Sequence, residues 1–167
     1  MKDITFKEEN IKFDYRVAAI IESDGKFLFQ QMEGDANLTL VGGRASLMKT
    51  SKESIIRELK EELGYEATEE QLELVQIAEN FFDYKDKDNK LQQVHSILFI
   101  YKMSISSDEE ITKKKDFCVL DKPQTKLFWI DKKEARNASI LPKIAKRLLE
   151  DSTFSYGIND DTLKENK

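Results

Sequence analysis

Cysteine, histidine and tryptophan each occur only once in this chain of 167 residues. The single cysteine, Cys118, cannot form a disulfide within the chain, so the sequence excludes a fold stabilised by internal disulfides. A lone histidine inside a strand is more often packed or hydrogen-bonded than a ligand. We therefore assign no catalytic role to His95.

Long hydrophobic runs are also missing. No apolar run approaches the roughly 18 residues that a membrane-spanning helix needs, and the longest ones are interrupted by Glu22 and Lys102. The first residues, MKDITFKEEN, lack the apolar core of a signal peptide. We therefore expect no membrane association and a cytoplasmic location.

The chain has fewer positive than negative side chains. The 27 lysine and arginine residues are outnumbered by 32 aspartate and glutamate residues, which gives a formal net charge of -5. Proteins that bind nucleic acid polymers usually present a basic face, so the composition favours a small-molecule ligand. The length and the 40% hydrophobic content suit one well-cored domain. We expect a single domain over residues 1–167, with a polar C-terminal tail over residues 151–167 that is frayed beyond Ser152.

The first half of the chain contains clear strand patterns. Two apolar runs within residues 15–32 flank Asp24-Gly25, a dipeptide that suits a tight turn, and so predict an antiparallel hairpin. Residues 38–41 predict a short strand. We expect this strand to stop at Gly42-Gly43, where the missing side chains allow close approach of a ligand.

A helix is the strongest prediction from periodicity. Thr50 or Ser51 can cap its first turn, and Gly64 provides its stop. Between them, apolar residues recur at helical spacing, namely Ile55, Ile56, Leu59 and Leu63. The sequence therefore predicts a helix that ends just before Gly64.

The second half of the chain predicts another pair of strands. Residues 72–84 and 91–103 are both rich in strand-forming residues and are joined by a polar turn. Residues 106–125 are charged and include Pro123, so we expect a long loop there. A short strand should follow over residues 126–130.

The C-terminal region predicts one more helix. Residues 139–151 have an amphipathic pattern, and Pro142 is acceptable in the first turn of a helix. We therefore expect a helix to close the domain before the polar tail.

The predicted helix before Gly64 carries an unusual stripe of carboxylates. With Glu58 at zero on a helical wheel, Glu62 falls at about +40° and Glu61 at about -60°. The stripe borders the apolar face, where like charges are costly unless a cation sits among them, and a hard divalent cation prefers such oxygen ligands. Arg57, at i,i+4 to Glu61, can reduce the repulsion. A solvated Glu-rich surface helix is the alternative interpretation.

The stretch from Gly43 to Tyr65 resembles the Nudix box, the signature of the Nudix hydrolases. The positions that match at the required spacing are Gly43, Arg57, Glu58, Leu59, Glu61, Glu62 and Gly64. Lys49 stands where the first glutamate of the box belongs. The resemblance extends over about residues 13–150 and implies an α+β fold, a Nudix-type α/β/α sandwich with a central mixed β-sheet.

This resemblance also implies a chemistry. Nudix enzymes cleave a diphosphate linkage, here expected in a nucleotide or nucleoside diphosphate derivative, with Mg²⁺ or alternatively Mn²⁺. The expected metal ligands are Glu58, Glu61, Glu62 and the Gly43 carbonyl. Family members are often dimers, so the resemblance leaves a homodimer open.

Catalytic and substrate-binding roles follow from the same resemblance. Arg57 would orient a glutamate, and Glu62 is a candidate general base, with Asp116 and Asp121 as alternatives. The candidate substrate contacts are Arg44, Arg16 and Phe81, with Phe13, Phe82 and Tyr84 as further aromatic candidates.

Lys49 raises a second functional hypothesis. Replacing a carboxylate by an ammonium changes the local charge by two units, which should weaken metal binding or direct the residue toward phosphate. Glu53, one turn along, faces away from the stripe and is not favoured as a substitute. The alternative is therefore a Nudix-fold nucleotide-binding or regulatory module with attenuated or lost hydrolysis. An acidic interaction domain without a ligand is the third hypothesis.

Overall fold

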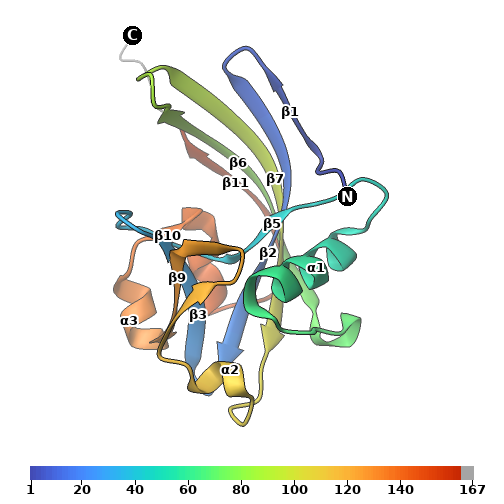
Figure 1. Ribbon diagram of the computed structural model, residues 1–167, viewed down its shortest axis with the longest axis vertical. Helices are drawn as coiled ribbons and strands as arrows, with labels where there is room; N and C mark the ends of the chain where they lie inside the picture. Colours follow the sequence, from blue (N-terminus) through green and yellow to red (C-terminus); the bar gives the residue numbers. More distant parts are fainter. Residues whose placement is uncertain (163–167) are drawn as a thin grey trace.

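The computed structural model describes residues 1–162, in which eleven strands form one mixed sheet (Figure 1). The strands are β1 (Thr5–Glu8), β2 (Ile11–Ser23), β3 (Lys26–Met32), β4 (Leu38–Thr39), β5 (Val41–Arg44), β6 (Glu73–Lys85), β7 (Leu91–Ser104), β8 (Asp116–Val119), β9 (Lys122–Asp131), β10 (Ile140–Leu141) and β11 (Ser155–Asp161). The main path through the sheet is β10-β4-β3-β2-β7-β6-β11. Parallel and antiparallel pairs coexist, because β2 pairs in parallel with β7 and antiparallel with β3. The expected mixed sheet is confirmed.

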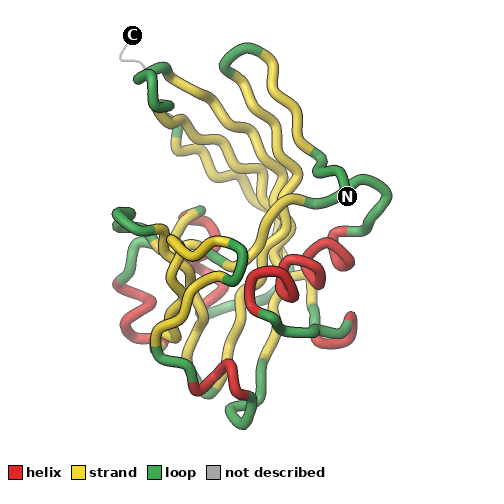
Figure 2. The backbone as a smooth tube through the Cα atoms, viewed as in Figure 1, coloured by secondary structure: helices red, strands yellow, loops and turns green. Residues whose placement is uncertain are grey.

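Helices cover both faces of this sheet. They are α1 (Ser51–Leu63), α2 (Glu110–Lys113) and α3 (Lys132–Asn137), together with the 3-10 helices η1 (Glu69–Gln71) and η2 (Lys143–Leu149). Side chains alternate along β2, so Val17 packs in the core under α1 and Ala18 packs in the core under α3 and η2. The helices gather around one half of the sheet, and the far ends of β2, β6 and β7 extend beyond them (Figure 2). This arrangement confirms the expected α+β sandwich.

The helix and hairpin predictions of the first half are confirmed. Ser23 pairs with Lys26 across the turn that holds Asp24-Gly25. Thr50 caps α1 in a reciprocal capping box with Glu53, and Gly64 ends the helix in a left-handed conformation with φ 68°. These local signals fix both ends of α1.

The strand at the glycine pair differs from its prediction. Residues 38–41 were expected to form one strand that stops at Gly42-Gly43, but β5 continues through both glycines to Arg44. At Gly42, β5 runs against β2 too closely for a side chain. A Cβ on Gly42 would lie 2.1 Å from the carbonyl oxygen of Val17, and Gly42 has a φ of +156°.

The expected loop over residues 106–125 is wrong. This segment contains α2 and β8, and β9 begins at Lys122, so β8 and β9 form an antiparallel hairpin. Because β9 also pairs with β3, the hairpin is part of the sheet. The charged residues and Pro123 predict a loop. The segment forms strands because β8 pairs with β9 and β9 pairs with β3.

The C-terminal predictions also change. The helix expected over residues 139–151 is replaced by β10, a cis peptide bond before Pro142 and the 3-10 helix η2. The tail expected to be frayed beyond Ser152 contains β11, which pairs in parallel with β6. Residues 163–167, the end of that tail, lie outside the described residues. No helix within residues 1–162 is long and apolar enough to cross a membrane.

Candidate active site

Two carboxylates of α1 are buried at the edge of the core. Leu59 and Leu63 hold the helix against the sheet, and this orientation leaves Glu58 only 7% exposed and Glu62 0% exposed. The third carboxylate of the stripe, Glu61, lies farther round the helix, and its side chain is 48% exposed. Burial therefore divides the predicted stripe into two desolvated carboxylates and one solvated carboxylate.

Glu58 is held between a glycine and an arginine. A Cβ on Gly43 would lie 2.3 Å from the Glu58 carboxylate, so only glycine leaves room for this carboxylate against β5. On its other side, Oε1 of Glu58 accepts a hydrogen bond of 2.6 Å from Arg57. The same guanidinium nitrogen of Arg57 donates to the carbonyl oxygen of Arg44 at 2.7 Å, so Arg57 joins the helix to β5.

Burial makes the charge on Glu58 costly. Desolvation raises the pKa of Glu58 to about 7, and the positive charge of Arg57 only partly opposes this rise. The neighbouring charges of Glu62 and Glu61 raise the pKa further. A carboxylate in this state gains from an added cation, because a cation relieves both the desolvation and the repulsion.

Glu62 is fully enclosed and uses both of its oxygens. Oε2 accepts a hydrogen bond of 3.2 Å from the backbone N–H of Gly42, and Oε1 lies 2.5 Å from Nζ of Lys122. Burial raises the pKa of Glu62, while the hydrogen bond and charge of Lys122 oppose the rise. No sequence pattern marks Lys122, because it is 60 residues from Glu62 in the chain and belongs to the segment expected to be a loop.

Lys49 lies apart from the two buried carboxylates. Its Nζ pairs with Glu53 at 3.1 Å, one turn along the chain, and both side chains are exposed. Lys49 lines neither of the cavities described below. The lysine that contacts a carboxylate of the stripe is therefore Lys122.

The arginines near the site have different partners. Arg44 donates from Nε to Asp14 at 3.1 Å and lies 3.6 Å from Asp3, so acidic side chains already compensate its charge. No hydrogen bond holds the guanidinium of Arg16 within residues 1–162, although it lines both cavities. Burial lowers the pKa of Arg16, and the negative charge of Asp14 opposes this fall.

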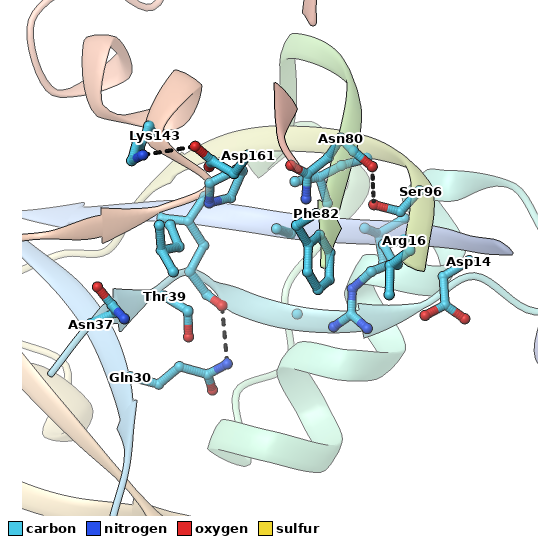
Figure 3. Close-up of a pocket in the computed structure, with 18 of the residues that line it drawn as sticks. Asp14, Arg16, Gln30, Asn37, Thr39, Asn80, Phe82, Ser96, Lys143 and Asp161 are labelled. Atoms are coloured by element: carbon cyan, nitrogen blue, oxygen red, sulfur yellow. Dashed lines mark hydrogen bonds and ion pairs between the residues drawn. The ribbon is translucent and has the colours of Figure 1, made fainter. Parts of the chain in front are cut away.

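Two cavities open on this region and share part of their walls. One has a volume of about 490 Å³ and includes Glu58, Glu61, Arg57, Asp121 and Lys122 in its wall. The other, of about 670 Å³, lies between β2, β6, β7 and η2 (Figure 3). Five residues line both cavities, namely Arg16, Gln30, Asn37, Thr39 and Gly42. The site is thus a charged cavity that continues into a larger one.

The wall of the larger cavity distinguishes two of the candidate aromatic contacts. Phe82, not Phe81, lines this cavity and projects into it (Figure 3). Phe81 stacks on His95, with ring centroids 4.4 Å apart, and lines neither cavity. The reason is strand alternation, since adjacent residues of β6 point to opposite faces of the sheet. Sequence alone does not set which face is which.

The donor set fits a hard divalent cation. Glu58 and Glu62 present carboxylate oxygens from one buried side of α1, and oxygen is the preferred donor for Mg²⁺. The absence of a Cβ at Gly43 brings the backbone of β5 close to the Glu58 carboxylate. No three His, Cys, Asp or Glu side chains within residues 1–162 converge on one point. Two buried carboxylates, rather than three, thus form the core of this set.

Comparison with known proteins identifies relatives of the whole domain and of a part of it. A model of the NUDIX domain matches residues 12–151. Over 56 residues the chain is 41% identical to the CTP pyrophosphohydrolase of Escherichia coli strain K12, a match that covers 31% of this chain and 42% of that protein. The matched region therefore spans less than half of that relative.

Solved structures share the fold. A MutT protein from Bacillus halodurans matches with a TM-score of 0.63 at 20% identity, over 87% of this chain and 88% of that chain. A NUDIX hydrolase from Nitrosomonas europaea matches with a TM-score of 0.54 at 17% identity, over 89% of this chain and 79% of that chain. At these identities the likeness shows the fold alone.

Proposed function

The chain belongs to the Nudix family, and we propose that it is a divalent-metal-dependent hydrolase that cleaves a diphosphate linkage in a nucleoside diphosphate derivative. The observation that carries this proposal is the pair of buried carboxylates on α1, of which Glu58 lines the smaller of two connected cavities and Glu62 lies fully buried beside it on the helix. Burying two carboxylates on one helix lowers the stability of the fold. Carboxylates with pKa values perturbed by burial cluster at functional sites.

The smaller cavity suits the diphosphate. Its wall contains Arg16 and Arg57, and Arg16 has a guanidinium without a hydrogen-bond partner among the described residues. A phosphate oxygen can accept from such a planar donor in a charge-assisted hydrogen bond. We assign diphosphate binding to Arg16 first. Arg44 ranks second, since Asp14 and Asp3 already pair with it.

The larger cavity suits the nucleoside. Its volume of about 670 Å³ lies in the usual range for small-molecule sites. Phe82 offers an aromatic surface for a base, and Asn37 and Asn80 offer amide donors and acceptors. Because five residues line both cavities, one ligand can place its base in the larger cavity and its diphosphate in the smaller.

We assign the metal, Mg²⁺ with Mn²⁺ as the alternative, to Glu58 and Glu62. Glu61 and the Gly43 carbonyl complete the proposed ligand set. A divalent metal held there would stabilise charge on phosphate oxygens and would lower the pKa of bound water. Arg57 keeps the Glu58 carboxylate in place through its bonds to Glu58 and to the carbonyl of Arg44.

The proton acceptor is assigned to Glu62. Burial raises the pKa of its carboxylate, and a raised pKa makes a carboxylate a better base. Asp121, which lines the same cavity as Glu58, is the first alternative, and Asp116, which like Glu62 lines neither cavity, is the second. The local match to a CTP pyrophosphohydrolase makes nucleoside triphosphates the first substrates to assay.

A hydrolysis assay over a panel of nucleotides tests this function. The purified protein is incubated with nucleoside triphosphates, dinucleotides and nucleoside diphosphate sugars, each with Mg²⁺, with Mn²⁺ and with EDTA. We expect at least one compound to be split at a diphosphate linkage, with turnover abolished by EDTA. Failure to split any compound under all metal conditions would refute the proposed activity.

A nucleotide-binding or regulatory module with weak hydrolysis is the second candidate. The observation that favours it is that no three acidic, histidine or cysteine side chains of the described residues converge on one point. Tight binding of a nucleotide without turnover in the same panel would support this candidate.

Three further expectations stay predictions. Light scattering would test the homodimer, cell fractionation would test the cytoplasmic location, and a single cooperative unfolding transition would test the single domain.

A further inference from the structure

The turn between β8 and β9 is attached to the end of α1. The backbone N–H of Leu120 donates to the carbonyl oxygen of Glu62 at 3.0 Å, and Val119 pairs with Lys122 across the turn. A Cβ on Gly64 would lie 3.4 Å from the Leu120 side chain, so this turn also packs at the C-cap of α1. The backbone therefore sets where the Lys122 side chain starts.

Lys122 reaches from this turn to a fully buried carboxylate. Its Nζ lies 2.5 Å from Oε1 of Glu62, and its side chain is 44% exposed while that of Glu62 is 0% exposed. A metal ligand oxygen must lie about 2.0–2.1 Å from Mg²⁺. Two cations cannot share Oε1 at these distances without strong repulsion.

Lys122 differs from Arg57, the other cation of the carboxylate site. Arg57 is anchored twice, to Glu58 and to the carbonyl oxygen of Arg44. Within residues 1–162, the Lys122 ammonium has Glu62 as its one hydrogen-bond partner. A flexible side chain with one partner can leave, whereas a guanidinium with two partners is held in place.

We propose that Lys122 is a displaceable internal counter-ion that competes with a divalent cation for Glu62. This inference rests on the proposed metal site and adds a regulation of it. Without metal, Lys122 neutralises Glu62. When a divalent cation binds, the ammonium moves off Oε1 into the smaller cavity, whose wall already includes Lys122, and there it faces the proposed diphosphate position.

Calorimetric titration with Mn²⁺ tests the competition directly. The full chain is compared with Lys122→Met and with the control Lys126→Met, an exposed lysine of the same strand β9. Removing the competing cation should tighten Mn²⁺ binding in Lys122→Met on the order of tenfold or more. Lys126→Met should keep the wild-type affinity within about twofold, since general surface charge is screened by salt.

A second variant keeps the test valid if Lys122→Met does not fold. Lys122→Gln removes the charge but can still donate a hydrogen bond to Glu62, and it should also bind Mn²⁺ more tightly than wild type. Equal or weaker binding by both Lys122 variants overturns the competition while leaving the metal site intact. A similar gain in Lys126→Met also overturns it. Absence of Mn²⁺ binding in every protein overturns both the competition and the proposed metal site.

Discussion

Two glutamates of helix α1 pair with lysines in very different surroundings. In the first turn, Glu53 lies 3.1 Å from Lys49, which precedes the N-cap four residues earlier in the chain, and both side chains are exposed. In the last turn, Glu62 is fully buried and its partner Lys122 comes from a distant hairpin at 2.5 Å. Water reaches both partners of the first pair, so this pair contributes little. In the second pair water reaches Lys122 but not Glu62, so this pair controls a desolvated charge.

This comparison changes the meaning of the unusual lysine in the Nudix box. Lys49 replaces the first box glutamate in sequence, yet in the structure its charge is directed to Glu53. The lysine that contacts a carboxylate of the site is Lys122, which no motif marks. Position in a motif therefore predicts less about the electrostatics of this site than burial does.

The largest expected effect is on turnover at the buried end of α1. Glu62→Gln removes the charge of a proposed metal ligand and base, and should lower kcat/KM on the order of a hundred- to a thousandfold. The matched control is Glu53→Gln, which can still accept the backbone hydrogen bond of the capping box. Steady-state assays on the best substrate would measure both. Equal losses of kcat/KM in Glu62→Gln and Glu53→Gln would contradict the difference between the buried and the exposed end of α1.

The next effect concerns the pH dependence of stability. Glu58 has a pKa of about 7 in the folded protein against 4.5 for the free group, so the folded state binds its proton more tightly. Its contribution is therefore fully present below about pH 4.5 and is lost as the pH rises to about 7. Glu58→Gln escapes this loss and should be more stable than wild type by about 3 kcal/mol at pH 8.

Urea unfolding in EDTA at pH 4 and pH 8 measures this difference. The two proteins should have similar free energies of unfolding at pH 4 and separate at pH 8. A gap that is the same at both pH values would contradict a raised pKa at Glu58.

A smaller effect is expected from removing Lys122, the cation that pairs with the buried Glu62. Lys122→Met leaves Glu62 without its ammonium and should lower the free energy of unfolding by about 1–3 kcal/mol at pH 8 without metal. Lys126→Met is the control. Urea unfolding measures both, and equal stabilities of the two variants would show that the 2.5 Å contact contributes nothing.

The smallest effect is expected at the exposed end. Lys49→Met should shift the Tm by less than about 2 °C and change kcat/KM by less than about threefold, because its partner Glu53 is solvated. Lys49→Glu, which restores the glutamate of the box, tests the same point in the other direction. A large gain in turnover for Lys49→Glu would show that Lys49 attenuates the native enzyme.

Local signals explain which elements could be predicted from sequence. The ends of α1 depend on Thr50 and Gly64, and the β2–β3 turn depends on Asp24-Gly25, so each is decided within a few residues. The stripe of Glu58, Glu61 and Glu62 follows from helical spacing alone. These features belong to one element, and neighbours in sequence determine them.

The features that sequence missed depend on contacts between distant segments. The β8–β9 hairpin is ordered by pairing with β3, and β11 by pairing with β6, although both segments are polar. The choice between Phe81 and Phe82 depends on which face of β6 meets the cavity. Lys122 meets Glu62 only because the hairpin turn docks on the end of α1. No pattern within a single segment encodes such contacts.

The most direct test of the account is to locate the bound metal in solution. Substoichiometric Mn²⁺ broadens the backbone NMR signals of residues near its site in the full chain. We predict that the signals of Gly42, Gly43, Glu58 and Glu62 broaden first, at lower Mn²⁺ concentrations than those of Thr50 and Glu53. Broadening centred on the exposed first turn of α1, or no selective broadening at all, would contradict a metal site at the buried carboxylates.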